Sequence, residues 1–307
     1  MRIIFMGTPE FAVPTLGTLN ENFSVNLVIS QMDKPKGRGK KVQFTPVKEK
    51  AMELMLDVYQ PEDINSNESI ERIKELNADF IVVVAYGQIL KKEILDLPRY
   101  GCINVHASLL PKYRGAAPIN WAIINGEKET GITIMEMEEG LDSGDMIARE
   151  SLEITSQDDY FSIHDKLSIM GSKLIVKALK DIKDGIALKT PQNHSLSTYA
   201  PMIFKETGKV NWNKSAEEIE NLVRGIGSPG AFTKYKDEKL KIYKIRSLPK
   251  SSNTKAGEII DVSKEGIFLN AKDKCIVIEE IQFPGKKKML VRDYLLGNTI
   301  EKGIILE

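Results

Sequence analysis

With 307 residues, of which 42% are hydrophobic and 28% charged, the chain is long enough to form two globular domains with buried cores. No apolar run reaches the roughly 18 to 20 residues that span a bilayer, and the apolar stretch after Met1 is too short for a secretory signal, so we expect a cytoplasmic protein. The formal net charge is zero, but residues from Ile203 onward carry 20 basic and 15 acidic side chains. This basic excess leaves open whether the C-terminal part binds an anionic partner.

The first part of the chain alternates short apolar runs with amphipathic stretches. The runs, rich in Ile and Val, cover residues 3–5, 25–29, 80–85 and 102–105. Residues 69–76 and 161–179 instead place apolar side chains at helical spacing. Apolar strands between helices are typical of a parallel sheet that is covered on both faces. We therefore predict an α/β, Rossmann-like domain with a mostly parallel sheet, whose ligands bind beyond the carboxyl ends of the strands.

The alternation weakens over residues 180–198, where Gly, Pro, Asn and Ser predict turns. Beyond them, residues 214–223 predict an amphipathic helix capped by Asn213 or Ser215. Short strands are then expected at 232–235, 239–245, 257–261, 266–269 and 275–281. We predict a first domain at 1–189, a linker at 190–205 and a small OB-like β-barrel domain at 206–307.

The turn after the first strand reads Gly7-Thr8-Pro9-Glu10. This is not the GxGxxG sequence that places a dinucleotide pyrophosphate on a helix amino terminus. A nicotinamide cofactor is therefore not expected.

Polar side chains interrupt the apolar strand that begins at Cys102. Asn104 and His106 share one face with Cys102, because side chains alternate along a strand. Buried polar groups are costly unless hydrogen-bonded, so Asn104 and His106 form either a structural pair or part of a functional site. Roughly 13 Å of strand separates Cys102 from His106, too far for His106 to activate the thiol. We interpret Cys102 as a core residue, and its distance from Cys275 predicts neither a disulfide nor a zinc site.

A second polar segment follows the strand-like residues 131–137 and reads Glu138-Glu139-Gly140-Leu141-Asp142-Ser143-Gly144-Asp145. Its glycines suit a tight loop, from which Asp142 can project into the cleft expected beside Asn104 and His106. An Asx-type turn would equally explain Asp142. A calcium loop is disfavoured, because the order of acidic residues does not match.

A third polar segment, at residues 33–41, holds five basic residues: Lys34, Lys36, Arg38, Lys40 and Lys41. Its Gly and Pro residues argue against regular structure, and a helix is expected to begin at Thr45-Pro46. Either a solvated loop or a contact with phosphates would explain the charge.

Three segments together carry a resemblance to a known family. They are Asn104-Val105-His106 with Ser108-Leu109-Leu110-Pro111, then Tyr113-Arg114-Gly115-Ala116-Ala117-Pro118, and then Gly140-Leu141-Asp142-Ser143-Gly144-Asp145. In order and spacing they resemble the formyltransferases that use 10-formyltetrahydrofolate. Within that group the chain looks like the enzymes that act on methionyl-tRNA over nearly its whole length, from Phe5-Met6-Gly7-Thr8-Pro9 to Pro284-Gly285-Lys286-Lys287.

The resemblance implies transfer of the formyl group of 10-formyltetrahydrofolate to the methionine amino group of initiator methionyl-tRNA. The implied catalytic residues are Asn104, His106 and Asp142. The residues implied to border the folate are Ser108, Leu109, Leu110 and Pro111. The residues implied to contact the tRNA are Arg38, Lys40 and Lys41, together with the C-terminal barrel. We expect no metal, no membrane contact and a monomeric protein.

One position departs from the family pattern. The family often has a lysine where this chain has Met202, and Lys205 lies three residues further on. The core motifs are also shared by enzymes that formylate small-molecule amines. A formyltransferase for a small amine and a non-catalytic RNA-binding protein therefore stay as alternatives.

Overall fold

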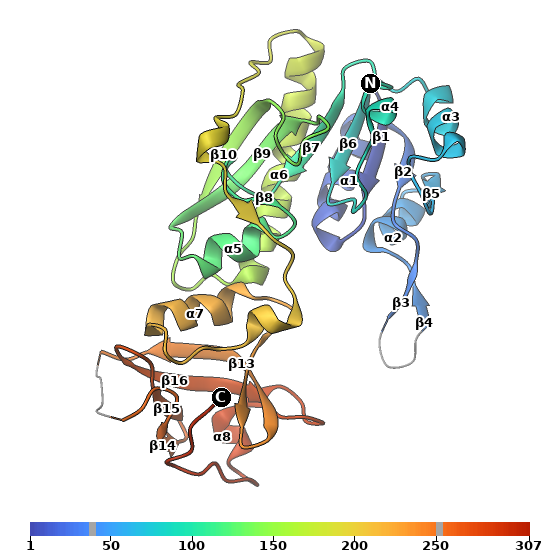
Figure 1. Cartoon of the computed structure of the whole chain (residues 1–307). Coiled ribbons are helices and arrows are strands. Elements are labelled where there is room, and N and C mark those ends of the chain that lie inside the picture. The colour runs from blue at the N-terminus through green and yellow to red at the C-terminus, as the bar shows by residue number, and fades with distance from the viewer. Residues whose placement is uncertain (37–40, 250–253) are drawn as a thin grey trace. The chain divides into compact units, whose positions relative to one another are not determined.

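The computed structural model describes residues 1–36, 41–249 and 254–307, which form two compact units (Figure 1). The first unit comprises Met1–Pro118, Glu129–Glu153 and His164–Ala200. The second comprises Ile119–Lys128, Ile154–Ile163 and Pro201–Glu307. The domain boundaries expected from the sequence, with a linker at 190–205, stay a prediction. No helix in the described ranges is long and apolar enough to cross a membrane.

Seven strands form the main sheet of the first unit, in the spatial order β10-β9-β7-β6-β1-β2-β5. Their bounds are Arg2–Gly7 for β1, Ser24–Ile29 for β2, Val58–Tyr59 for β5, Phe80–Val84 for β6, Cys102–His106 for β7, Glu129–Glu136 for β9 and Met146–Glu153 for β10. Strands β5, β2, β1, β6 and β7 are parallel, and β9 runs antiparallel to β7 and β10. The predicted Rossmann-like, mostly parallel sheet is confirmed.

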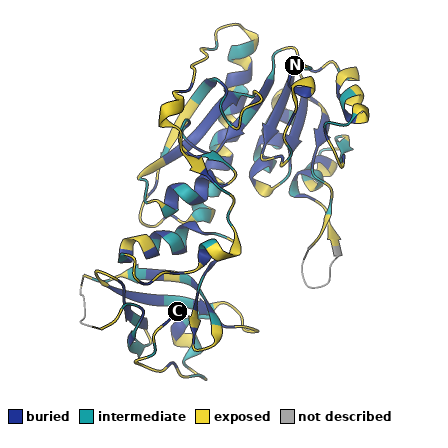
Figure 2. Cartoon of the chain, in the orientation of Figure 1, coloured by how far each residue is buried: buried dark blue, intermediate teal, exposed yellow. Residues whose placement is uncertain are grey.

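Helices cover both faces of this sheet, whose strands are largely buried (Figure 2). Their bounds are Val13–Asn22 for α1, Pro46–Glu53 for α2, Asn67–Glu75 for α3, Lys92–Leu95 for α4 and Tyr160–Lys183 for α6, and the 3-10 turns η1 and η2 span Glu10–Ala12 and His194–Leu196. Ile73 of α3 and Ile94 of α4 share a core cluster with Cys102. Gly171 of α6 lies on the opposite face, where an added Cβ would be 2.8 Å from Cγ1 of Val105. Side chains of β7 therefore alternate between two different helix layers.

Two short pairs of strands complete the first unit. Strand β8 (Arg114–Gly115) pairs with β11 (Tyr199–Ala200). Strands β3 (Lys34–Lys36) and β4 (Lys41–Gln43) form an antiparallel hairpin, with Pro35 opposite Val42. The expectation of no regular structure in this basic segment is therefore wrong for the hairpin strands, because backbone pairing outweighs the local effect of Pro35 at an edge.

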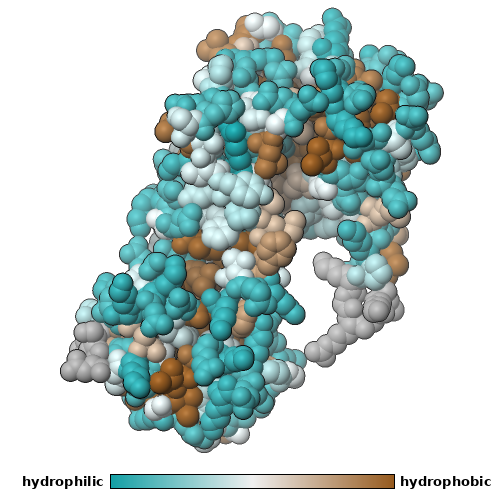
Figure 3. Space-filling model, viewed as in Figure 1, coloured by the Kyte–Doolittle hydropathy of each residue, from teal (hydrophilic) through white to brown (hydrophobic). Residues whose placement is uncertain are grey.

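The second unit holds an antiparallel sheet in the order β12-β13-β16-β15-β14, with β17 paired to β16. The strand bounds are Ala231–Tyr235 for β12, Glu238–Ser247 for β13, Ile259–Ser263 for β14, Gly266–Asn270 for β15, Cys275–Gln282 for β16 and Met289–Leu290 for β17. The helical bounds are Pro118–Ile124 for α5, Lys205–Gly208 for the 3-10 turn η3, Ala216–Gly225 for α7 and Val291–Tyr294 for α8. On the face seen in Figure 3, hydrophilic residues cover most of the surface of each unit.

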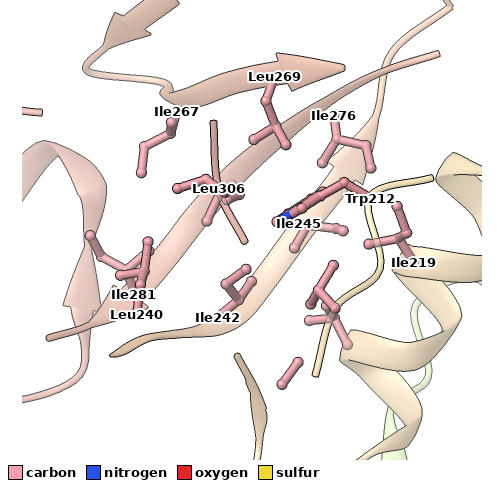
Figure 4. Close-up of a cluster of buried hydrophobic side chains, with 14 of the residues drawn as sticks. Trp212, Ile219, Leu240, Ile242, Ile245, Ile267, Leu269, Ile276, Ile281 and Leu306 are labelled. Atoms are coloured by element: carbon pink, nitrogen blue, oxygen red, sulfur yellow. The ribbon is translucent and has the colours of Figure 1, made fainter. Parts of the chain in front are cut away.

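The C-terminal residues close this sheet into a barrel. Ile259 N donates to Ile304 O at 2.8 Å, and Leu306 N donates to Gly257 O at 2.9 Å, beside β14. On the other side, Lys234 of β12 and Glu307 exchange two backbone hydrogen bonds. Leu306 is 2% exposed and points into the hydrophobic cluster of the barrel (Figure 4). The predicted barrel is confirmed, but the sequence did not indicate this closing segment.

Candidate functional site

The carboxyl end of β7 carries two of the candidate residues. Asn104 lies in register with Val83 of β6 and Met135 of β9, and His106 with Thr133 of β9. His106 is buried, whereas Asn104 is half-buried, and its carboxamide makes no hydrogen bond to any described residue. Asn104 is therefore available to donate a hydrogen bond to a ligand at this edge of the sheet.

One ring nitrogen of His106 has a fixed role. Nε2 lies 2.9 Å from the backbone oxygen of Tyr113, and because a carbonyl oxygen only accepts, Nε2 donates. In the neutral ring the other nitrogen, Nδ1, is then free of hydrogen. Nδ1 lies 3.6 Å from Oδ2 of Asp142, close enough for an ion pair with a protonated ring but too long for a hydrogen bond. Nδ1 is therefore the nitrogen of His106 that can take up and release a proton.

The carboxylate of Asp142 is anchored by a distant part of the chain. Its Oδ2 accepts a hydrogen bond of 2.8 Å from the backbone N of Gly115. Gly115 has φ +109°, and a Cβ there would lie 2.6 Å from the ring of Tyr199, so only glycine fits. Asp142 itself has φ +48°, which an aspartate tolerates better than most residues. The hydrogen bond to Gly115 makes the side chain part of a long-range site instead of an Asx-type turn.

Gln192 holds the loop of Asp142, a role that sequence analysis did not indicate. Its buried Nε2 donates to the backbone oxygens of Asp142 and Gly144, both at 2.8 Å. Its Oε1 accepts from Arg114, at 2.7 Å from Nη2. Gln192 belongs to the segment predicted to be a linker, where no periodic pattern marks it. A buried glutamine between turn residues becomes recognisable only once its partners are known.

Residues 108–111 continue directly from β7. The Ser108 hydroxyl donates to Lys112 O at 2.7 Å, and Thr133 Oγ1 donates to Ser108 O and accepts from Leu110 N. Ser108 and Leu110 are buried, whereas Leu109 and Pro111 are half-buried. The segment is thus a firmly held wall beside His106, and Leu109 and Pro111 provide most of its accessible surface.

The structure describes only one of the three predicted tRNA-binding residues. Arg38 and Lys40 lie outside the described residues, and Lys41 is placed as the first residue of β4. Their contact with tRNA stays a prediction.

Cys102 lies in the core, as predicted. It is 1% exposed, and its Sγ lies 3.7 Å and 3.8 Å from the backbone oxygens of Leu95 and Ile94. Burial raises the pKa of the Cys102 thiol well above its ordinary value, which suppresses the nucleophilic thiolate. Within the described ranges, no three His, Cys, Asp or Glu side chains gather to hold a metal ion.

Comparison with known proteins places this geometry in a family. Residues 1–179 match the formyl transferase family model, and residues 202–299 match the model of the formyl transferase C-terminal domain. The chain is 51% identical to methionyl-tRNA formyltransferase of Clostridioides difficile (strain 630), over 100% of both chains. It is 52% identical to methionyl-tRNA formyltransferase of Alkaliphilus oremlandii, over 100% of this chain and 99% of the relative.

A similar fold occurs in the N-formyltransferase from Helicobacter canadensis, solved in complex with folinic acid and dTDP-3-aminofucose. The TM-score is 0.67 at 20% identity, over 90% of this chain and 98% of that one. Similarity at this level of identity shows the fold alone. Together with the full-length relatives, the two family matches establish that the chain belongs to the methionyl-tRNA formyltransferases of the formyl transferase family.

Proposed function

We propose that the protein transfers the formyl group of 10-formyltetrahydrofolate to the amino group of methionine on initiator methionyl-tRNA, in the cytoplasm and as a monomer. The observation that carries this proposal is the 51% identity to a methionyl-tRNA formyltransferase over the whole length of both chains. The carboxyl edge of the sheet, where Asn104, His106 and Asp142 gather, supplies groups that suit the reaction.

The reaction exchanges one C–N bond for another. The methionyl amine attacks the formyl carbon, which forms a tetrahedral intermediate with an oxyanion. The bond to the folate nitrogen then breaks, the oxyanion becomes the carbonyl of formyl-methionine, and tetrahydrofolate leaves with a proton on its nitrogen. The Asn104 carboxamide, which has no hydrogen bond to the described residues, is proposed to donate to the oxyanion.

His106 and Asp142 are proposed to move the proton. Nδ1 of His106 is the free ring nitrogen and faces Asp142 at 3.6 Å. In this scheme the attacking amine loses its proton toward Asp142, directly or through water. The proton passes from Asp142 to Nδ1 of His106, and His106 then gives it to the leaving folate nitrogen, so both side chains return to their starting state. The hydrogen bond from Gly115 N keeps the carboxylate in position while the charges change.

Ser108, Leu109, Leu110 and Pro111 are proposed to border the folate. They follow His106 directly, and the accessible apolar surface of Leu109 and Pro111 suits a flat ring system. The folinic acid bound in the Helicobacter canadensis enzyme supports a folate-type donor for this fold.

Arg38, Lys40 and Lys41, together with the barrel, are proposed to bind the tRNA. On β12 and β13, Phe232 lies opposite Lys241, and Nζ of Lys239 lies 3.3 Å from the centroid of the Phe232 ring. Burial, together with the positive charges of Lys205 and Lys241, lowers the pKa of Lys239. A phosphate backbone would stabilise the positive charge of Lys239, and an unstacked base could pack on the Phe232 ring beside it.

The proposal is tested by incubating the protein and 10-formyltetrahydrofolate with initiator methionyl-tRNA or with dTDP-3-aminofucose. We expect formyl-methionyl-tRNA and no formylated sugar, and the reverse result would favour the small-amine alternative.

Asn104→Ala should lower kcat about 10²- to 10³-fold with little change in either KM, because the lost hydrogen bond forms only in the transition state. Asn22→Ala, at an exposed helix end, is the control.

A further inference from the structure

Two buried side-chain atoms in the described part of the chain lack a hydrogen-bond partner, and one of them is Nε2 of Gln31. Folded proteins leave few buried polar groups unpaired, because desolvation without a partner costs free energy. Gln31 lies two residues beyond the carboxyl end of β2, a parallel strand. Such a group at such an edge indicates a ligand that supplies the missing partner.

The backbone of Gln31 is held firmly on both sides. Its N donates to Oγ1 of Thr8 at 3.3 Å, and its O accepts from Nε2 of Gln60 at 2.7 Å. Gln60 is itself fixed, since it donates to Asp33 at 2.9 Å and accepts from Lys48 at 2.7 Å. The polar groups that hold the backbone of Gln31 are thus paired with one another, whereas Nε2 of its carboxamide is uncommitted.

Gln31 lies at the same carboxyl edge of the sheet as Asn104. Asn104 is in register with Val83, Val83 with Met6, and Met6 with Ile29. Gln31 lies two residues beyond Ile29, the last residue of β2, so both carboxamides lie at the carboxyl edge of the sheet. Three strand spacings, roughly 14 Å, separate the strands of Gln31 and Asn104. A formyl acceptor that binds Gln31 must therefore extend roughly 14 Å along this edge to reach Asn104.

Exposed apolar side chains accompany Gln31. Met32 is 49% exposed and Phe44 is 46% exposed. Their segments are joined by a 2.6 Å hydrogen bond between the hydroxyls of Ser30 and Thr45. Nζ of Lys48 lies 4.2 Å from the centroid of the Phe44 ring, so a positive charge already lies beside this apolar surface.

The surface formed by Gln31, Met32 and Phe44 has the chemistry of a nucleobase site. A glutamine carboxamide can pair with the edge of adenine, and exposed aromatic or apolar side chains stack on its face. Gly87 borders this surface with φ +98°, and an added Cβ there would contact Cγ of Gln31 at 3.7 Å. The strands β3 and β4, which follow in the chain, contain Lys34, Lys36 and Lys41.

We propose that Gln31, Met32 and Phe44 bind the terminal adenosine of the charged tRNA and so position the methionyl amine at Asn104. This rests on the proposed function, because the terminal adenosine is the nucleoside to which every tRNA esterifies its amino acid. Gln31 is then a positioning residue, and its unpaired Nε2 is completed by the adenine ring.

A thermodynamic cycle on the full chain tests the proposal by direct binding of uncharged initiator tRNA. Intact tRNA and tRNA that lacks its terminal adenosine are each titrated against the wild-type protein and Gln31→Leu. Each single change should weaken binding about 10-fold, and both together should weaken it no further, because they remove the same contact. Independent losses that multiply to about 100-fold would overturn the proposal.

Two further measurements separate positioning from a structural role. Gln31→Leu should leave Tm unchanged or raise it, since it removes an unpaired buried donor, and it should leave the KM for 10-formyltetrahydrofolate within about 2-fold. Phe44→Ala should give the same cycle, whereas Gln157→Leu, at an exposed site, should affect neither tRNA. A lower Tm with equal loss for both tRNAs would contradict the proposal. Because the cycle measures binding, absence of formyl transfer by the wild type would refute the proposed function separately.

Discussion

Cys102 lies on the strand face that also carries Asn104 and His106, yet its thiol belongs to the core. We predict that Cys102→Ala keeps wild-type turnover and lowers the free energy of unfolding by about 1 kcal/mol, because it opens a small cavity. Urea unfolding and steady-state kinetics measure the two effects. Turnover reduced more than about 10-fold in a folded variant would instead assign chemistry to the thiol. Alkylation of the folded protein should be slow, since burial raises the pKa of Cys102.

At the level of single residues, the sequence located Asn104 and His106 because strand alternation is a local property. Asp142 was ambiguous, since its carboxylate is held by Gly115, 27 positions away. Gln192 was missed, because its partners at Asp142 and Gly144 lie about 50 positions away in sequence. A group whose function depends on such long-range hydrogen bonds leaves no periodic trace.

Helix α6 packs closely on the sheet through a glycine. We predict that Gly171→Val lowers the free energy of unfolding by about 1–3 kcal/mol, because its Cβ would lie 2.8 Å from Val105 Cγ1 in a packed layer. Gly17→Ala in α1 is the matched control, with nothing within 4 Å of the added Cβ. It should stabilise the protein by about 0.4–1 kcal/mol through the lost freedom of the unfolded chain. Equal effects of the two substitutions in thermal unfolding would show that the α6 contact yields easily.

Helix α7 begins with a capping box. Glu218 N donates to Oγ of Ser215 at 3.2 Å, and Ser215 N donates to Oε2 of Glu218 at 3.0 Å. The hydrogen bond from Ser215 N, with further bonds from Lys214 and the Ser215 hydroxyl, lowers the pKa of Glu218 to about 2. Because the folded pKa is below the unfolded pKa of about 4.3, the charged carboxylate of Glu218 stabilises the fold above about pH 4.3. This stabilisation is lost as the pH falls toward about 2.

Glu218→Gln should therefore flatten the acid dependence of stability between about pH 4.3 and pH 2. The substitution keeps a neutral acceptor for Ser215 N but removes the charge, so it should also lower stability at neutral pH. Thermal unfolding over this pH range measures the effect, and Glu21→Gln at an exposed position is the control. The same acid dependence in Glu218→Gln and the wild type would contradict the role of the cap.

Many elements followed from their periodicity, but several others did not, and two of them show why. The hairpin β3–β4 has strands of three residues, and Pro35 within it suggested a loop. The closing segment of the barrel at 304–307 is as short, and its pairing with Gly257 and Lys234 spans much of the second unit. Pairing partners far apart in sequence decide such short strands, and local composition does not contain that information.

At the scale of the whole molecule, closure of the barrel can be tested with two adjacent residues. Leu306→Ala should lower the free energy of unfolding of the second unit by about 2–5 kcal/mol, because its side chain is 2% exposed in the cluster of Figure 4. Ile305→Ala, at a residue 43% exposed, should cost less than about 1 kcal/mol. Tryptophan fluorescence reports this unit, since Trp121 and Trp212 both belong to it. Similar costs at both positions would show that the segment does not complete the core.

The second unit is assembled from three separate stretches of chain. Asn120 donates to the backbone oxygens of Gly225 and Ile226 at 2.9 Å and 3.2 Å, and Arg224 donates to those of Thr155 and Asp158 at 3.0 Å. A recombination event that exchanged residues 201–307 alone would separate these donors from their acceptors. Residues 201–307 are therefore not a self-contained domain that recombination can exchange without loss of these hydrogen bonds. Residues 201–307 make these hydrogen bonds only together with the two earlier segments, so substitutions in either part of the gene act on the same folding unit.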